Sequence, residues 1–224
     1  VVGRMDRDTT SGKDAFEGII NDFQANRIQI LVGTQMISKG LDFDNVRVVG
    51  IIAADTLLNY PDFRSHERGF QLITQAAGRA GRRDKQGTVI IQTADPEQPI
   101  YRFITRNDYE GFYHSQIAER KLFKYPPFTR LITIVIKHKD EQKVEQAAIT
   151  FSQLLTQSLG NRVLGPNKPI VSRIQQLHIR EILLKIDHVF SPTQVREFLK
   201  SSEARLRKNS DFKQVLLYYN VDWV

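Results

Sequence analysis

The chain has 224 residues, of which 41% are hydrophobic, so it can form one large domain or two small ones with a buried core. Its 32 Lys and Arg residues exceed its 25 Asp and Glu residues, and this balance weakly favours a polyanionic partner. The lack of cysteine excludes disulfides and cysteine zinc sites, and no apolar run is long enough to span a bilayer. Because the sequence begins without methionine or a signal-peptide pattern, we expect an excised piece of an intracellular protein.

The first half of the chain alternates short apolar runs with helical patterns. We predict strands at Gln29–Val32, Val46–Ile52 and Gly87–Gln92, a loop at Ala53–Asp62, and helices at Lys13–Asn26, Phe63–Ala80, Pro96–Asn107 and Tyr109–Phe123. The β-branched strands are typical of a sheet that is buried on both faces. This alternation predicts a parallel sheet with helices on its faces, and such sheets bind ligands in the loops that follow their strands.

Consecutive prolines at Pro126 and Pro127 end the helical pattern, and a different plan follows them. We predict strands at Phe128–Lys137, Val171–Gln176, Ile179–Asp187 and Lys213–Val221, and helices at Glu141–Leu159 and Thr193–Leu206. The order βαββαβ predicts a ferredoxin-like α+β domain at 124–224, after an α/β domain at 1–123.

The stretch Gln71–Arg83, QLITQAAGRAGRR, places Arg79 and Arg82 three residues apart near the end of a predicted helix. A glycine inside a helix costs about 1 kcal/mol relative to alanine, so Gly78 and Gly81 indicate close approach of another surface or of a ligand. On a helix both guanidinium groups would face the same way, and their donors match the oxygens of a phosphate. A solvated basic helix end explains the same residues equally well.

A second stretch, ILVGTQMISKGLDF at Ile30–Phe43, decides between these interpretations. Together the two stretches closely resemble motifs V and VI of superfamily-two helicases. The intervening DTLLNYPDFRSHERGFQL, the GRMDRDT at Gly3–Thr9 and the YPPF at Tyr125–Phe128 are similar to the primosomal replication-restart helicases of that superfamily. The resemblance covers essentially the whole chain, and it implies a RecA-like second helicase lobe at 1–123 that carries both motifs.

The resemblance also implies the roles of site residues. In motif VI, Arg82 would be the arginine finger, Arg79 its partner, and Gln75 would couple the nucleotide to the lobe interface. In motif V, Gly40 and Asp42 would lie near the nucleotide. The residues implied to contact the nucleic-acid backbone are Thr34, Gln35 and Lys39. From the residues alone, Thr34 also fits an ordinary helix N-cap, and Asp42 fits a capping or turn aspartate.

Two helicase features are absent from the sequence. Gly12-Lys13-Asp14 is not a phosphate loop, because Arg7 stands where the first glycine is needed and Asp14 where Ser or Thr is needed. No acidic motif of the DEAD or DEAH type is present to hold Mg²⁺. We therefore expect ATP and Mg²⁺ to be bound mainly by a first lobe outside this sequence, and these residues alone to be inactive. Full-length relatives carry zinc, but we predict no metal ligand in this chain.

The activity implied by the resemblance is that of an ATP-dependent 3′→5′ DNA helicase that restarts stalled replication forks. The implied partners are branched and single-stranded DNA, other primosome proteins and the single-stranded-DNA-binding protein, in the bacterial cytoplasm at the nucleoid and with no membrane. An alternative is a non-catalytic module for nucleic acid or protein that keeps a helicase-like scaffold, and a third is an RNA helicase or a different superfamily-two translocase. In the second domain, basic residues could form a basic face. Its aromatic residues Tyr218, Tyr219 and Trp223 could stack on bases, although core packing or a docking surface is the commoner use of such residues.

Overall fold

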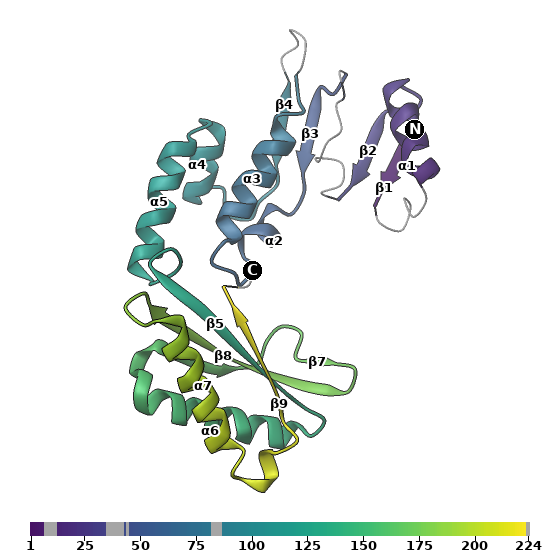
Figure 1. The fold of residues 1–224 in the computed structure, drawn as a ribbon. Helices are drawn as coiled ribbons and strands as arrows, with labels where there is room; N and C mark the ends of the chain where they lie inside the picture. Colours follow the sequence, from purple (N-terminus) through teal and green to yellow (C-terminus); the bar gives the residue numbers. More distant parts are fainter. Residues whose placement is uncertain (7–12, 35–42, 44, 82–86, 223–224) are drawn as a thin grey trace. The chain divides into compact units, whose positions relative to one another are not determined.

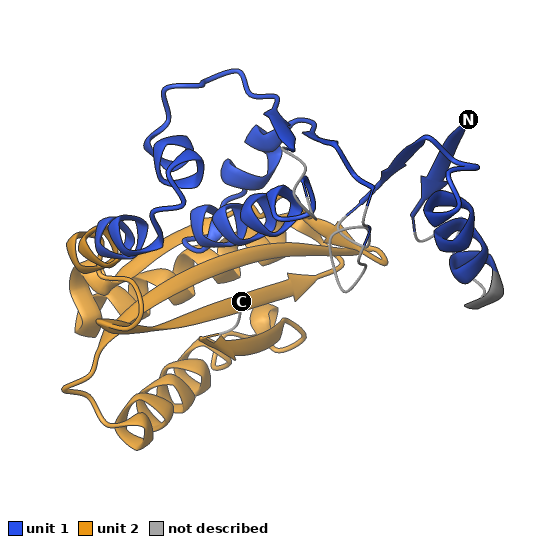
Figure 2. Cartoon of the chain, turned by 90° about the horizontal axis from the view of Figure 1, so that it is seen from above, with its two compact units in different colours: residues 1–116 blue, residues 117–224 orange. Residues whose placement is uncertain are grey.

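A computed structural model describes residues 1–6, 13–34, 43, 45–81 and 87–222. The chain is of the mixed α/β class and divides into two compact units, Val1–Gln116 and Ile117–Val224 (Figure 2). Within the described residues, no helix combines the length and apolarity that crossing a membrane requires.

The first strand pair lies near the N-terminus. β1 (Val2–Met5) pairs in parallel with β2 (Ile30–Gly33), and α1 (Lys13–Gln24) lies between them in the sequence (Figure 1). The rings of Phe23 and Phe43 meet edge to face with their centroids 4.9 Å apart, which packs α1 against the chain beyond β2. The helix and the strand predicted here are both confirmed, within two residues at their ends.

The second strand pair of the first unit is separated in the sequence by two helices. β3 (Val48–Ile51) pairs in parallel with β4 (Thr88–Ile91), and α2 (Ala54–Leu58) and α3 (Ser65–Ala77) lie between them in the sequence (Figure 1). The loop predicted after β3 contains α2, which sequence patterning missed because the helix is little more than one turn long.

The prediction that these strands are buried on both faces is wrong for the described structure. Val48 of β3 is 58% exposed and Ile90 of β4 is 57% exposed. The physical reason is that each described strand of the first unit pairs with a single neighbour, so much of its apolar surface has nothing packed on it. The β-branched composition correctly indicated strands but not their burial.

The core of the first unit joins α2 and α3 to two further helices, α4 (Pro99–Thr105) and α5 (Tyr109–Leu122). Phe70 of α3 stacks on Phe112 of α5, with ring centroids 4.3 Å apart and an interplanar angle of 8°. Aromatic side chains bury large apolar areas, so this pair fastens α3, and with it the segment that follows α3, to the helical part of the unit.

The second unit is an antiparallel sheet with two helices packed on one face (Figure 1). Its elements in chain order are β5 (Thr129–His138), α6 (Glu141–Leu159), β6 (Val163–Asn167), β7 (Arg173–Ile174), β8 (Leu177–Asp187), α7 (Pro192–Leu206) and β9 (Leu216–Val221). The strand order is β6-β8-β5-β9, all neighbours are antiparallel, and the short β7 pairs with β8.

Sequence patterning located the helices of the second unit better than its strands. The predicted limits of α6 are confirmed, because the Asp140 side chain accepts hydrogen bonds from the N–H groups of Gln142 and Lys143 and so fixes the first turn. The strand that follows α6 is β6, which sequence patterning missed because it contains Pro166. The strand predicted at 171–176 is reduced to the two residues of β7.

The hydrophobic core of this unit lies between the sheet and its helices. Alternate residues of β5, namely Ile132, Ile134 and Ile136, point to the helix side and are at most 5% exposed. Phe151 and Leu155 of α6 are fully buried against them. The face of β5 that carries these three isoleucines is therefore the face that α6 and α7 cover.

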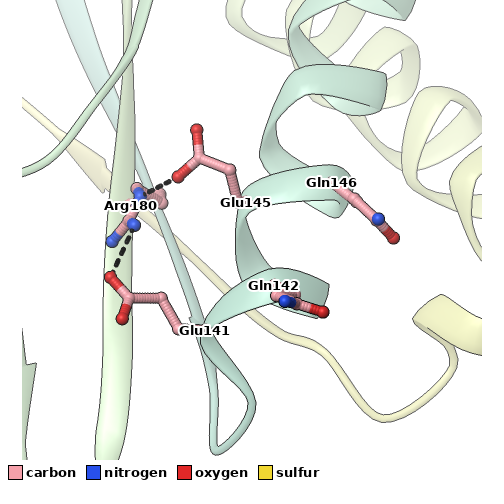
Figure 3. Close-up of a pocket in the computed structure, with 5 residues that line it drawn as sticks. All are labelled: Glu141, Gln142, Glu145, Gln146 and Arg180. Carbon is pink, nitrogen blue, oxygen red and sulfur yellow. Dashed lines mark hydrogen bonds and ion pairs between the residues drawn. The ribbon is translucent and has the colours of Figure 1, made fainter.

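A charged group is buried at the edge of this core. The Arg180 side chain, on β8, is 7% exposed and forms ion pairs with Glu145 and with Glu141 of α6, the latter at 3.0 Å (Figure 3). Glu141 also lies 3.3 Å from the Lys168 ammonium, and hydrogen bonds from Arg180 and then Lys168 hold the pKa of Glu141 below its ordinary value of 4.5. These contacts tie the first two turns of α6 to β8.

The segment that follows α5 is fixed to the second unit. The boundary between the two units falls inside α5, after Gln116. Beyond that helix, the Lys185 ammonium of β8 donates to the Phe123 carbonyl at 2.7 Å and lies 3.7 Å from the centroid of the Tyr125 ring. The His188 ring nitrogen Nε2 lies 2.7 Å from the Pro127 carbonyl oxygen. The proline-containing segment is therefore an attached part of the second unit rather than a free linker.

We expect Arg180→Met to lower the free energy of unfolding by about 2 kcal/mol, because Glu141 and Glu145 lose their shared partner while remaining partly exposed. Urea unfolding measures this, with Arg173→Met on the exposed β7 as the matched control. A double-mutant cycle that combines Arg180→Met with Glu145→Gln should give a coupling energy between these two side chains. A loss no larger than that of the control would contradict the anchoring role of Arg180.

The lowered pKa of Glu141 predicts a pH dependence. Its contribution to stability is present above its unfolded pKa, near 4.5, and is lost as the pH falls through the lower folded value. Between about pH 6 and about pH 3, the unfolding free energy of Glu141→Gln should therefore fall less than that of the unmodified chain. Glu197→Gln, which replaces an exposed carboxylate on α7, is the matched control.

Candidate functional site

The end of α3 carries the described part of the predicted motif VI site. The helix ends at Ala77, three residues earlier than predicted, and Gly78 to Gly81 form a turn after it. Gly81 has a φ of +73°, in the left-handed region that favours glycine, so the helix cannot continue through it. The N–H of Gly81 instead donates to the carbonyl of Val46, just before β3, at 3.1 Å.

The prediction that Arg79 lies on the helix is therefore wrong. Arg79 follows the C-cap residue Gly78, and its N–H donates to the Ala76 carbonyl at 3.0 Å as part of the turn. The side chain of Arg79 is partly exposed, and Gln75 is exposed on the last turn of α3. Gln75 and Arg79 thus lie on consecutive segments, the last turn of α3 and the turn that follows it. The stack of Phe70 on Phe112 holds α3 in the unit.

The two glycines of motif VI have different explanations. A Cβ at Gly78 would meet only the carbonyl oxygens of Thr74 and Gln75, at 3.5 and 3.6 Å, which are ordinary contacts. Among the described residues nothing approaches Gly78 closely, and approach of a ligand or of another protein surface at this position stays a prediction. Gly81 is required by its left-handed backbone conformation.

Most of the motif V prediction lies outside the described residues. Thr34 is described and is exposed immediately after β2, at the carboxyl end of a parallel strand, as predicted. The predicted site residues that the structure does not describe are Gln35, Lys39, Gly40, Asp42 and Arg82. The assembly of the complete site therefore stays a prediction.

In the second unit, several of the basic residues considered for a nucleic-acid surface are engaged by acids. Arg162 pairs with Asp187 at 2.7 Å, and Arg180 is buried with its two glutamates. The Tyr219 hydroxyl donates to Glu203 at 3.0 Å, and burial together with this carboxylate raises its pKa. Tyr219 therefore packs against the core as a partly buried side chain.

Tyr218 faces the other side of β9 and remains available for contact. It is 49% exposed, and the Lys137 ammonium lies 5.1 Å from its ring centroid. Trp223 lies outside the described residues. Of the three aromatic residues considered for stacking, one is thus half-exposed and one packs against the core.

An open hollow of about 360 Å³ lies beside the buried arginine, lined by Glu141, Gln142, Glu145, Gln146 and Arg180 (Figure 3). Both of its carboxylates pair with Arg180, and Glu141 also pairs with Lys168, so its polar chemistry is that of a structural ion-pair network. Among the described residues, no group of three or more His, Cys, Asp or Glu side chains is arranged to hold a metal ion.

Comparison with known proteins gives the family. Residues 4–84 match the family described as helicase conserved C-terminal domain, and residues 121–223 match the primosomal protein N C-terminal domain. The replication restart protein PriA of Bacillus subtilis (strain 168) is 38% identical over 216 residues, which is 96% of this chain. This chain belongs to the PriA family.

Other PriA relatives match to a similar degree. PriA of Synechocystis sp. is 40% identical over 81% of this chain, and PriA of Haemophilus influenzae is 37% identical over 96%. The matched regions are 22% and 30% of those relatives, and 26% of the Bacillus subtilis protein. The chain thus spans about a quarter of the length of these PriA proteins, and the predicted resemblance to replication-restart helicases is confirmed.

Proposed function

We propose that this chain is part of an ATP-dependent 3′→5′ DNA helicase that restarts stalled replication forks and supports primosome assembly. The observation that carries the proposal is the match of nearly the whole chain to proteins named replication restart protein PriA. The helicase family match at 4–84 covers the candidate site, from Thr34 to Arg82. In this proposal the protein works in the bacterial cytoplasm, at the nucleoid.

The proposed architecture is a RecA-like lobe followed by a ferredoxin-like domain, with a boundary near residues 123 and 124. Parallel strand pairs with helices in their connections support the first assignment. The antiparallel order β6-β8-β5-β9, with α6 and α7 on one face, supports the second. Neither fold decides function by itself, so the argument for activity rests on motif VI.

In the proposed mechanism, Arg82 is the arginine finger and Arg79 its partner at the terminal phosphate of ATP. A phosphoryl transition state spreads negative charge over its equatorial oxygens, and guanidinium groups held in a dry cleft stabilise that charge. Gln75, exposed on α3 four residues before Arg79, couples the nucleotide to movement of the lobe. Gly40 and Asp42 line the nucleotide side of the same cleft.

The remaining partners follow from the same proposal. Thr34, Gln35 and Lys39 contact the DNA backbone, as polar side chains and N–H groups after a strand suit phosphates. The DNA is a branched fork or a single strand, and the protein partners are other primosome proteins and the single-stranded-DNA-binding protein. Most of the contacts to ATP and Mg²⁺ come from a first lobe, since the chain has no phosphate loop and its described residues form no metal-binding cluster.

Replacing the finger tests the mechanism. In the intact helicase that contains this chain, Arg82→Ala should lower DNA-stimulated ATP hydrolysis about 10³-fold or more while fork binding is retained. Arg83→Ala is the matched control, because it changes the adjacent arginine of the same basic run. Unchanged ATPase in Arg82→Ala would support the non-catalytic scaffold instead. Unwinding of forks compared with RNA duplexes then separates a DNA helicase from an RNA helicase.

The 224 residues by themselves should hydrolyse ATP negligibly, with or without single-stranded DNA, because they lack a phosphate loop. A phosphate-release assay on the purified chain measures this, with the intact helicase as the positive control. DNA-stimulated turnover by the chain alone would mean that it contains a nucleotide site of its own.

A further inference from the structure

Three segments of backbone converge where α3 ends. The turn after the helix is joined to the segment directly before β3 by the hydrogen bond from the Gly81 N–H to the Val46 carbonyl. At the next residue, still before β3, the Arg47 carbonyl accepts from the N–H of Thr88, the first residue of β4, at 2.8 Å. The motif VI turn, the segment before β3 and the start of β4 are therefore connected by consecutive hydrogen bonds.

Gly87 lies at the centre of this convergence, directly before β4. A Cβ built on Gly87 would lie 2.4 Å from the nitrogen of Gly81, 2.5 Å from the carbonyl carbon of Ala80 and 2.8 Å from the Ala80 Cβ. Two of these three atoms are backbone atoms, which cannot swing away as the tip of a side chain can. Any side chain at Gly87 must therefore displace the peptide between Ala80 and Gly81.

The need for glycine at this position comes from the lack of space for a Cβ. Gly81 needs glycine for its positive φ, whereas an alanine at Gly87 would place its Cβ against backbone atoms of the turn. Its cost would fall on the neighbouring turn, one residue beyond Arg79. Gly87 therefore limits where the backbone that carries Arg79 can lie.

We propose that Gly87 is a positioning residue for the motif VI arginine Arg79. This inference rests on the proposed helicase function. By leaving room for the Ala80–Gly81 peptide directly before β4, Gly87 fixes where the backbone that follows Arg79 lies. A displacement of about 1 Å at a group that stabilises a transition state can cost about 10²-fold in rate.

The test is Gly87→Ala in the intact helicase, with DNA-stimulated ATP hydrolysis measured over a range of ATP concentrations. We expect kcat to fall about 10-fold or more while KM for ATP and affinity for single-stranded DNA stay within about twofold. Gly18→Ala is the matched control, because a Cβ at Gly18 meets no atom within 4 Å, and it should behave as the unmodified enzyme. An unchanged kcat in folded Gly87→Ala overturns the proposal, as does an equal loss in the control.

A second variant covers the case in which Gly87→Ala does not fold. Ala80→Gly removes the Cβ that packs near Gly87 and loosens the turn without adding a clash, so it should lower kcat about threefold with little change in KM. Unchanged kcat in this variant overturns the proposal in that case.

Arg79→Ala distinguishes failure of the role proposed for Arg79 from failure of the positioning role proposed for Gly87. If it retains full ATPase, the role proposed for Arg79 fails and the positioning role fails with it, whereas loss in Arg79→Ala with full activity in Gly87→Ala removes only the positioning role.

Discussion

The candidate site depends on the tight fit between the backbone of the turn after α3 and the backbone of Gly87. The left-handed Gly81 ends the helical path, and its N–H is taken up by Val46 rather than by the helix. Gly87 then passes so close to the turn that no side chain fits between them. A catalytic arginine gains most of its effect from being held in place before the reaction begins, so a turn pinned by backbone contacts suits that task better than a flexible helix end.

The two units differ in how far they bury their apolar side chains. The second unit encloses a core between its sheet and two helices, and even its buried arginine is matched by two carboxylates. The strands of the first unit leave residues such as Val48 and Ile90 more than half exposed. Each described strand of the first unit has a single neighbouring strand, which leaves these apolar side chains uncovered.

Elements whose limits depend on neighbouring residues in the chain, such as N-caps and apolar periodicity, were predictable from the sequence. Helix α6 was located to the residue, since Asp140 is a good N-cap and a regular apolar stripe follows it. Burial of β3 and β4 was not predictable, because a β-branched run reports strand propensity and says nothing about how many neighbours the strand has. β6 was missed because a proline in a five-residue strand resembles a turn.

The candidate site was predictable in identity but only partly in geometry. Motif VI was recognised from Gln75, Arg79 and Arg82, yet the end of α3 was placed three residues too late. The deciding residue, Gly81, has a left-handed conformation that a helical pattern does not reveal. The role of Gly87 depends on a contact between segments separated by several residues, and no periodicity in the sequence reports such a contact.

The attachment of the segment after α5 has a consequence for how the second unit can be isolated. A clone that starts at Lys124 would delete the Phe123 carbonyl that accepts from Lys185, and it would also cut away the last turns of α5. The ammonium of Lys185, whose pKa is already lowered by burial and by Lys124, would then lose its neutral acceptor. Expression boundaries should instead precede Ile117, where the compact unit itself begins, so that the final part of the helix is retained as a structural cap.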